Sequence, residues 1–339
     1  MNNISGKITL GRECNIYIGT ACEVLKEVLP KQRVIAIIDR RVAELYPDFS
    51  AQFETILFDG GEGNKTIDNV VNIHFELLKR GADRKTFILG IGGGITTDVV
   101  GFVAATYMRG VKFGFISTTL LGQVDASIGG KNGVNLHDYK NIIGTFTHPT
   151  FVISDPSMLG TLPRRELRAG MAEVVKSAII ADAELFEILE RADKANIYSN
   201  TTLAEAVMRS AIIKRDIVEQ DEREAGMRRL LNLGHTLGHA IEKCTHEVNH
   251  GEAVAMGLSL ISHVAAKRNI LAQADAERID TLLLKLGFEL TPPVPMRTIL
   301  DAVKYDKKKD NDLIHLVLPE AIGRCRIEQI PMGEISAMF

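Results

Sequence analysis

Three histidines stand close together in this sequence, in a stretch that also favours a helix. His235 and His239 are four residues apart in LNLGHTLGHAIE, so on a helix their side chains share one face. His250 follows soon after, directly before Gly251-Glu252. Two imidazoles and one carboxylate are typical ligands of a catalytic zinc ion, with one position left for substrate or water. The pattern indicates a catalytic metal centre; the alternative is that these histidines are structural and unrelated.

A second metal motif overlaps this cluster. Residues 246–250 read HEVNH and match HExxH, in which two histidines on one helix face bind zinc and the glutamate acts as base. Val248 and Asn249 are weak helix formers, and Gly251 follows at once. We therefore expect the helix to begin only after Gly251, which disfavours a zinc protease. That interpretation would also leave the glycine-rich first half of the chain unexplained.

A carboxylate that could complete the metal set lies upstream. Glu173 precedes Lys176 by three residues in the otherwise apolar segment AEVVK, so both side chains share a helix face. Charged groups on an apolar face need partners, because burying an unpaired charge is costly. The two residues could simply pair with each other, or a metal ion could supply another partner for Glu173.

Glycines in the first half suggest a nucleotide site. A strand predicted at residues 85–89 runs into Gly92-Gly93-Gly94, ahead of a helical segment at 97–105. Glycine lets backbone amides approach a phosphate, and a helix N-terminus adds favourable partial charge. The glycines do not form the GxGxxG fingerprint, so a tight turn is the alternative. Asp39 and Asp59 each end a predicted strand, where a carboxylate could accept hydrogen bonds from a ribose or only cap a turn.

Several cations stand beside glycines, asparagines or apolar helix positions. Such residues suit a phosphorylated ligand, because the charge and the backbone can both reach it. Each of them alone could equally be a surface charge. They are Arg109, Lys131, Lys140 beside Asn141, Lys176, Lys214 and Arg228.

Two kinds of secondary structure must position these residues. Apolar strands are predicted at 34–38, 53–58, 85–89, 113–116 and 151–153, with a helix at 66–80, which indicates a parallel sheet covered by helices. Beyond residue 163 the apolar spacing is helical, at 166–179, 183–189, 203–218, 240–244, 253–266 and 274–286, before a small hairpin at 313–318 and 324–330. This change predicts an α/β domain at 1–161 and a mainly α-helical domain at 162–339.

Composition narrows the class of protein. The 339 residues are 45% hydrophobic and 24% charged, the balance of a soluble globular enzyme. The net charge of -3 gives no basic field for nucleic acid. The four scattered cysteines disfavour a disulfide framework or a thiolate zinc site. With no signal-peptide core and no apolar run that could span a bilayer, we expect a cytoplasmic protein without a membrane partner.

Taken together, the motifs resemble those of the 3-dehydroquinate synthase family over about residues 39–327. The matching pieces are GGGITTDVVGFVAATYMRG, STTLLGQVDASIGGKNGVN, KNIIGTF, TLPRRELRAGMAEVVK, and LNLGHTLGHAIE with HGEAVAMG. The resemblance implies a Rossmann-like NAD-binding domain followed by a mostly helical domain that binds metal and substrate. It further implies a homodimer.

The resemblance also implies an activity. The family converts 3-deoxy-D-arabino-heptulosonate 7-phosphate to 3-dehydroquinate and phosphate in the shikimate pathway of aromatic amino acid biosynthesis, with NAD used catalytically and Zn²⁺ or Co²⁺ bound. Other sugar phosphate cyclases and a metal-dependent NAD polyol dehydrogenase are alternatives, and the phosphate-binding lysines disfavour the dehydrogenase. A non-catalytic NAD-binding sensor would need neither metal ligands nor phosphate-binding lysines.

Site residues follow from the resemblance position by position. The metal ligands implied are Glu173, His235 and His250, while His246 receives no role. The substrate residues implied are Arg109, Asp125, Lys131, Asn141, Lys176, Lys214, Arg228, Asn232 and His239, with Lys307 or Lys308 near the phosphate. The NAD residues implied are Asp39, Gly60, Glu62, Lys65, Gly93, Gly94, Asp98, Thr118, Thr119, Lys131, Lys140 and Thr161.

Two segments depart from the family pattern, both on the NAD side. Thr97 replaces a glycine in GGGITTD, and Gly60 stands before GEGNK where the familiar form has an aspartate. Either change could alter the local backbone or the affinity for NAD.

Overall fold

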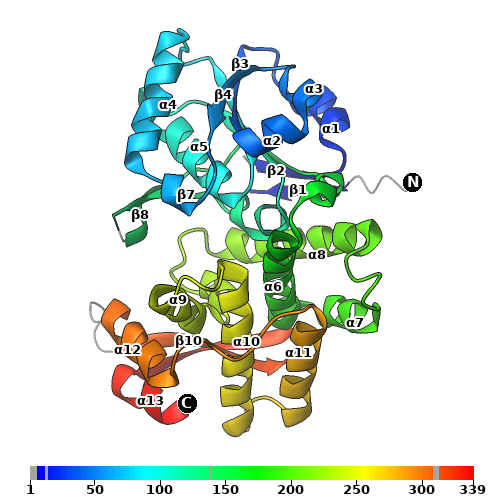
Figure 1. The fold of residues 1–339 in the computed structure, drawn as a ribbon, viewed down its shortest axis with the longest axis vertical. Coiled ribbons are helices and arrows are strands. Elements are labelled where there is room, and N and C mark those ends of the chain that lie inside the picture. Colours follow the sequence, from blue (N-terminus) through cyan, green and yellow to red (C-terminus); the bar gives the residue numbers. More distant parts are fainter. Residues whose placement is uncertain (1–5, 12–13, 138, 308–312) are drawn as a thin grey trace. The chain divides into compact units, whose positions relative to one another are not determined.

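The computed structural model describes residues 6–11, 14–137, 139–307 and 313–339. The chain divides into two compact units, Met1–Leu167 and Arg168–Phe339 (Figure 1). The boundary predicted from the sequence, between residues 161 and 162, lies a few residues earlier. Within the described residues, no helix is both long enough and apolar enough to cross a membrane.

The first unit is built on a seven-stranded sheet. Its strands are β1 (Gly6–Leu10), β2 (Cys14–Ile18), β3 (Val34–Asp39), β4 (Glu54–Phe58), β5 (Phe87–Gly92), β6 (Phe113–Ser117) and β9 (Phe151–Ser154). They lie in the order β1-β2-β9-β6-β5-β3-β4, and every neighbouring pair is parallel except β1 with β2. Strands β5, β6 and β9 are buried along their whole length, as in parallel sheets covered on both faces.

Helices and a hairpin complete this unit. The helices are α1 (Ala21–Val28), α2 (Arg40–Leu45), α3 (Pro47–Ser50), α4 (Ile67–Lys79) and α5 (Gly94–Thr106). Shorter helical turns are η1 (Glu62–Asn64), η2 (Tyr107–Arg109), η3 (Gly122–Ala126) and η4 (Pro156–Thr161). The hairpin pairs β7 (Lys131–Leu136) with β8 (Tyr139–Phe146). The α/β class and the five predicted strands are confirmed, whereas β1, β2 and the hairpin were not predicted.

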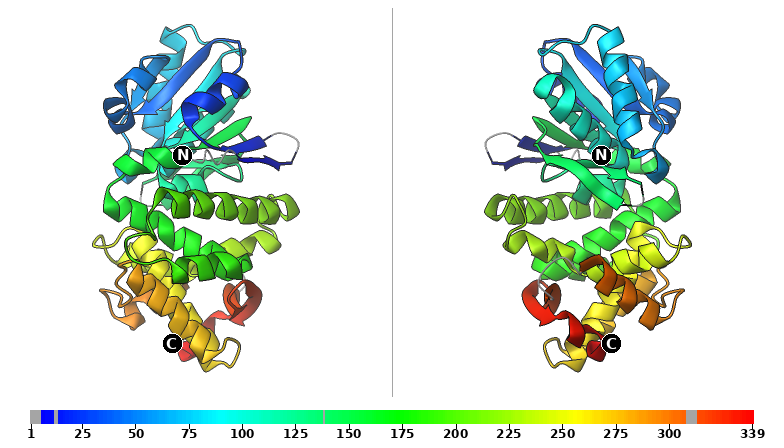
Figure 2. Two further views of the ribbon diagram at one scale, coloured as in Figure 1. Left: turned by 90° about the vertical axis from the view of Figure 1, so that its right-hand side faces the viewer. Right: turned by 90° about the vertical axis from the view of Figure 1, so that its left-hand side faces the viewer.

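The second unit is mainly helical (Figure 2). Its helices are α6 (Arg164–Ala181, which spans the division), α7 (Ala183–Arg191), α8 (Asn200–Gln220), α9 (His235–Cys244), α10 (His250–Lys267), α11 (Gln273–Lys285), α12 (Met296–Lys307) and α13 (Ile335–Met338). Two short turns, η5 (Met227–Asn232) and η6 (Met332–Glu334), and the predicted hairpin of β10 (Leu313–Ala321) and β11 (Arg324–Pro331) accompany them. The mainly helical class predicted for this half is confirmed.

Two helix starts were predicted wrongly. Helix α10 begins at His250, not after Gly251, because Asn249 and Glu252 form a reciprocal capping box at its N-terminus. Helix α9 likewise begins earlier than predicted, at His235. Residues 245–249 between the two helices are not helical. The HExxH segment therefore does not present two histidines on one helix face, and the protease interpretation is excluded.

Candidate functional site

Glu173, His235 and His250 converge inside the second unit. Glu173 lies in α6, and the two histidines are the first residues of α9 and α10. Both Nε2 atoms face the same carboxylate oxygen, with 3.4 Å from His235 Nε2 and 3.3 Å from His250 Nε2 to Glu173 Oε1. One potential ligand atom from each residue lies within 4.8 Å of the others. The structure thus brings together all three residues of the metal set implied by the resemblance.

Close packing of α9 against α10 fixes the two histidines. Gly234 precedes His235 with φ +75°, a left-handed conformation that favours glycine. A Cβ on Gly234 would lie 2.9 Å from the backbone nitrogen of Leu258 in α10. A larger residue here would force the first turn of α9 away from α10 and separate the imidazoles.

Each ligand histidine has its second ring nitrogen occupied. His235 Nδ1 lies 3.1 Å from the carbonyl oxygen of Leu233, and His250 Nδ1 lies 3.1 Å from Glu242 Oε2. An Nδ1–H donated to these acceptors leaves the Nε2 lone pair directed at the shared centre. Metal-binding histidines are held in this way by a carbonyl or a carboxylate.

The Glu173 carboxylate is buried, with 1% of its surface exposed. Lys176 Nζ pairs with Oε2, yet among the described residues neither carboxylate oxygen has a hydrogen bond of good geometry. Burial would raise the pKa of Glu173, but the charge of Lys176 and the two imidazoles outweigh it and hold the pKa well below its ordinary value. The carboxylate is therefore an anion whose remaining lone pairs suit a cation.

The two imidazoles differ in their protonation. Burial lowers the pKa of His235 to about 3, and the nearby Lys176 charge adds to the effect. Burial acts in the same direction on His250, but the two carboxylates that flank its ring, Glu173 and Glu242, outweigh it and raise the pKa of His250 to about 10. His250 is therefore the more basic of the two imidazoles without metal, and a divalent cation beside Glu173 would compete with its proton. The donor set of two imidazoles and one carboxylate fits Zn²⁺ or Co²⁺.

His239 stands beside this cluster but differs in exposure. It lies one turn after His235 on α9, with ring centroids 5.2 Å apart, and it is exposed to solvent while His235 is buried. His239, Glu242 and His250 form a second group whose potential ligand atoms lie within 4.8 Å of one another. His246 is exposed on the loop after α9 and belongs to neither group.

Three buried cations lie in the same unit as the candidate metal residues. Lys176 in α6, Lys214 in α8 and Arg228 in η5 are all buried, at 2%, 7% and 2% exposure. Arg228 is held by its loop, since its Nη1 donates to the carbonyl of Glu222 and its backbone N–H donates to Asp221 at 3.0 Å. Asn232 Nδ2 donates to Glu224 Oε1 at 2.5 Å.

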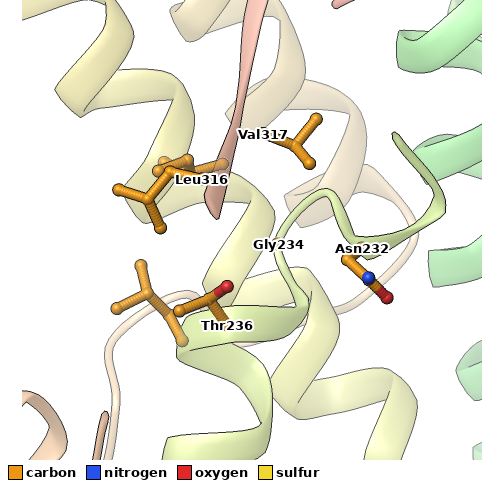
Figure 3. Close-up of a pocket in the computed structure, with 7 residues that line it drawn as sticks. Asn232, Gly234, Thr236, Leu316 and Val317 are labelled. Carbon is orange, nitrogen blue, oxygen red and sulfur yellow. The ribbon is translucent and has the colours of Figure 1, made fainter. Parts of the chain in front are cut away.

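A small cavity of about 10 Å³ lies behind this loop, between the start of α9 and β10. Figure 3 shows the amide of Asn232 directed away from Leu316 and Val317, which line it. A space of this size holds about one water molecule and cannot hold a sugar phosphate. Asn232 therefore presents its amide on the other side of the loop.

In the first unit, predicted NAD residues gather at the carboxyl ends of parallel strands. Asp39 ends β3, Gly93 and Gly94 link β5 to α5, and Thr118 and Thr119 follow β6. Ligands of open parallel sheets bind at this edge. Thr97, one of the two departures, lies in the first turn of α5, where its Oγ1 donates to the carbonyl of Gly94 at 2.9 Å, so the helix is intact.

The second departure, Gly60, has a clear steric reason. A Cβ on Gly60 would lie 2.2 Å from Asp39 Oδ2. Asp39 Oδ1 accepts from the backbone N–H of Arg41 at 2.9 Å, and Oδ2 accepts from Thr96 Oγ1 at 3.3 Å. Thr96 therefore fixes the Asp39 carboxylate in a position that only glycine at residue 60 leaves open.

Four further predicted residues form one hydrogen-bonded network. Lys65 Nζ donates to Asp98 Oδ2 and Asn141 Oδ1, both at 2.5 Å. Asn135 joins them to Glu62, since its Oδ1 accepts from Asn141 N at 2.9 Å and its Nδ2 donates to Glu62 Oε1 at 2.8 Å. Predicted NAD residues thus contact a predicted substrate residue.

The remaining predicted residues are placed separately. Thr161 shares a hydrogen bond of 2.9 Å with Tyr46, and Asp125 lies in η3. Lys131 and Lys140 are exposed on the β7–β8 hairpin. Arg109 is exposed in η2 with φ 70°. The side chain of Lys307 and the whole of Lys308 lie outside the described residues.

Glu242, Asp221 and Asn135 were missed by the sequence analysis. Glu242 could have been noticed, because it stands three residues after His239 on the histidine-bearing face of α9. No local pattern marks Asn135, whose partner Glu62 is distant in the sequence. Asp221 binds backbone N–H groups only a few residues further along, but its spacing matched no motif that we considered.

Comparisons with known proteins show the family of this chain. The model of the 3-dehydroquinate synthase N-terminal domain matches residues 55–169, and that of the C-terminal domain matches residues 170–309. A 3-dehydroquinate synthase of Streptococcus mutans serotype c is 41% identical over 322 residues, covering 92% of this chain and 91% of the relative. The chain belongs to the 3-dehydroquinate synthase family.

Solved structures of sugar phosphate cyclases share the fold of this family member. A 2-epi-5-epi-valiolone synthase from Streptomyces hygroscopicus subsp. jinggangensis 5008, with NAD⁺ and Zn²⁺ bound, is 27% identical with a TM-score of 0.87, covering 98% of this chain and 96% of that one. A 2-deoxy-scyllo-inosose synthase complexed with carbaglucose-6-phosphate, NAD⁺ and Co²⁺ is 26% identical with a TM-score of 0.87, covering 98% of each chain.

Proposed function

We propose that this chain is a 3-dehydroquinate synthase, which converts 3-deoxy-D-arabino-heptulosonate 7-phosphate to 3-dehydroquinate and phosphate with catalytic NAD and one Zn²⁺ or Co²⁺ ion. The observation that carries the proposal is the buried Glu173 carboxylate, which faces two imidazole Nε2 atoms in a chain of this family. The sequence identity of about 40% to curated synthases favours this reaction over those of the cyclases with the same fold.

In this proposal Glu173, His235 and His250 hold the metal. Bound NAD would supply reversible hydride transfer, and the bound metal would supply a positive charge that polarises substrate oxygens. His235 contributes a neutral imidazole, because burial and Lys176 disfavour its protonated form. His239, exposed next to this centre, would move a proton between a substrate hydroxyl and solvent through its imidazole nitrogens.

The cations would bind and orient the substrate anion. Lys176, Lys214 and Arg228 are held in place by burial, so they lose little freedom when a phosphate or carboxylate binds. Asn232 would add a neutral donor. Arg109, Asp125, Lys131 and Asn141, with Lys307 or Lys308, belong to the same substrate set in the proposal, on the strength of the family motifs.

NAD would bind at the carboxyl edge of the sheet of the first unit. Asp39 lies where a ribose hydroxyl is recognised in such folds, and the start of α5 at Gly93-Gly94 suits a pyrophosphate. The set proposed there also has Gly60, Glu62, Lys65, Asp98, Thr118, Thr119, Lys131, Lys140 and Thr161. A cytoplasmic homodimer is part of the proposal and is supported by the family resemblance.

To test the proposal, purified, zinc-loaded protein is mixed with 3-deoxy-D-arabino-heptulosonate 7-phosphate and with less than one equivalent of NAD. Phosphate and 3-dehydroquinate are then measured together. We expect many turnovers per NAD, abolished by a chelator and by His235→Ala and unchanged in His246→Ala. NADH accumulation without phosphate release would instead indicate a polyol dehydrogenase. Bound metal and NAD without turnover would point to another sugar phosphate.

A further inference from the structure

Glu242 is mostly buried next to the metal set, with 12% of its side chain exposed. It lies in α9, seven residues after His235, so both side chains lie on the same face of this helix. Its Oε2 lies 3.1 Å from His250 Nδ1, while the opposite ring nitrogen of His250 lies 3.3 Å from Glu173 Oε1. The His250 ring is thus held between two carboxylates on its two nitrogen atoms.

The two ligand histidines differ in what holds them. His235 is oriented by a backbone carbonyl, that of Leu233, and 11% of its side chain is exposed. His250 follows a non-helical loop, 32% of its side chain is exposed, and its Nδ1 partner is a side chain. The orientation of His250 therefore depends on one replaceable residue, whereas the orientation of His235 does not.

We propose that Glu242 is a positioning residue of the metal centre: it accepts the Nδ1–H of His250 and so turns the Nε2 lone pair toward the cation. The carboxylate charge also makes the imidazole a stronger donor. Partners of this kind typically change metal affinity by about 10–100-fold when they are removed. The inference rests on the metal site of the proposed function, and it adds a residue that binds neither metal nor substrate.

A different role for Glu242 must be separated from this one. His239, Glu242 and His250 are close enough to hold a cation themselves. A second ion there would need His250 Nδ1, the atom that faces Glu242. If Glu242 only positions His250, each chain should bind one metal ion. If Glu242 is itself a metal ligand, each chain should bind two ions. The second ion would then be lost in both Glu242→Ala and His239→Ala.

The experiment measures metal affinity and coordination in the full-length chain. Zn²⁺ affinity is determined by competition with a chromophoric chelator, and the cobalt form is examined by its visible absorption spectrum. We expect Glu242→Ala to bind Zn²⁺ about 10–100-fold more weakly and to alter the cobalt spectrum. Glu242→Gln keeps an acceptor oxygen but loses the charge, so its affinity should lie between those of wild type and Glu242→Ala.

Glu247→Gln is the matched control, because Glu247 is an exposed glutamate on the loop between α9 and α10. It should keep wild-type affinity and spectrum. Wild-type affinity and spectrum in Glu242→Ala would overturn the inference, as would a stoichiometry of two metal ions. If Glu242→Ala does not fold, the Zn²⁺ affinity and the cobalt spectrum of Glu242→Gln are compared with those of the wild type instead, and wild-type values would again overturn the inference. Metal binding by the wild type without cyclase turnover would contradict the proposed function and leave this inference standing.

Discussion

The metal cluster and the nucleotide edge of the sheet satisfy their polar groups in different ways. At the edge, Asp39 is bound by Arg41 N and Thr96, and Lys65 is bound by Asp98 and Asn141. In the cluster, the buried Glu173 carboxylate has charges around it but, within the described residues, no hydrogen bond of good geometry. Asp39 and Lys65 at the edge thus already have hydrogen-bond partners within the protein, whereas the Glu173 carboxylate has lone pairs that a cation could use.

This difference indicates which of the two regions depends on a bound ligand for its stability. Removing the metal should lower the free energy of unfolding of the second unit, because the Glu173 carboxylate, Lys176 and the imidazole of His235 are buried together. A nucleotide bound at the edge as proposed would exchange existing hydrogen bonds for new ones, so its binding should be sensitive to small geometric changes. The following predictions test this contrast, beginning with the largest expected effect.

Glu173→Gln should cause the largest change. It breaks the buried ion pair between Glu173 and Lys176, and breaking such a pair by removing one partner costs about 3–5 kcal/mol. Denaturant unfolding of the metal-free proteins should therefore give a free energy of unfolding lower by that amount. Zinc binding and cyclase turnover should both be lost.

The double variant Glu173→Gln with Lys176→Met is the matched control. With both charges of this pair removed, most of the lost stability should return while zinc binding stays absent. Zinc at about 1,000 times its Kd should stabilise the wild type by about 4 kcal/mol and leave the double variant unchanged. A double variant as unstable as Glu173→Gln would show that the cluster depends on contacts other than this ion pair.

Much of the fold was predictable because buried strands and amphipathic helices leave clear apolar patterns. The β7–β8 hairpin was not, since most side chains of β8 are exposed and its pairing rests on backbone hydrogen bonds. The start of α10 could have been predicted, because Asn249 and Glu252 have capping-box spacing. The convergence of Glu173 with the histidines depends on how three helices pack, which no local pattern records. The family resemblance supplied that grouping.

Gly60→Ala should have a smaller effect, confined to the nucleotide edge. The new Cβ would displace the Asp39 carboxylate, which caps the N-terminus of α2, and losing such a cap costs about 1 kcal/mol. NAD affinity should also fall, because the displaced Asp39 carboxylate is the group proposed to accept a ribose hydroxyl. Gly60→Asp should weaken NAD binding further, because it adds a carboxylate next to Asp39.

Isothermal titration with NAD measures this effect, and zinc affinity provides the internal control. Zinc binding should not change in either Gly60 variant, because the two candidate ligand groups found among the described residues both lie in the second unit. An equal loss of zinc and NAD affinity would contradict the separation of the two regions.

The smallest effect concerns the loop that carries Arg228. Asp221 accepts backbone N–H groups of Ala225 at 2.9 Å, Gly226 at 2.7 Å and Arg228 at 3.0 Å. These bonds form without any ligand, so this part of the second unit resembles the nucleotide edge. Asp221→Asn should raise KM for the substrate severalfold by loosening Arg228, with little change in zinc affinity. A loss of zinc binding equal to the rise in KM would show that the loop supports the metal ligands as well.

The pH dependence of the Asp221 contribution has a definite sign. The backbone N–H of Gly226, followed by those of Arg228 and Ala225, holds the pKa of Asp221 below its ordinary value. A carboxylate with a lowered folded-state pKa stabilises the fold fully above its unfolded pKa of about 4, and this contribution disappears as the pH falls through the folded-state value. The difference in unfolding midpoint between wild type and Asp221→Asn should therefore be constant from pH 8 to about pH 5 and shrink below about pH 4. A difference that instead grew on acidification would mean that the loop is held by groups other than the ionised Asp221 carboxylate.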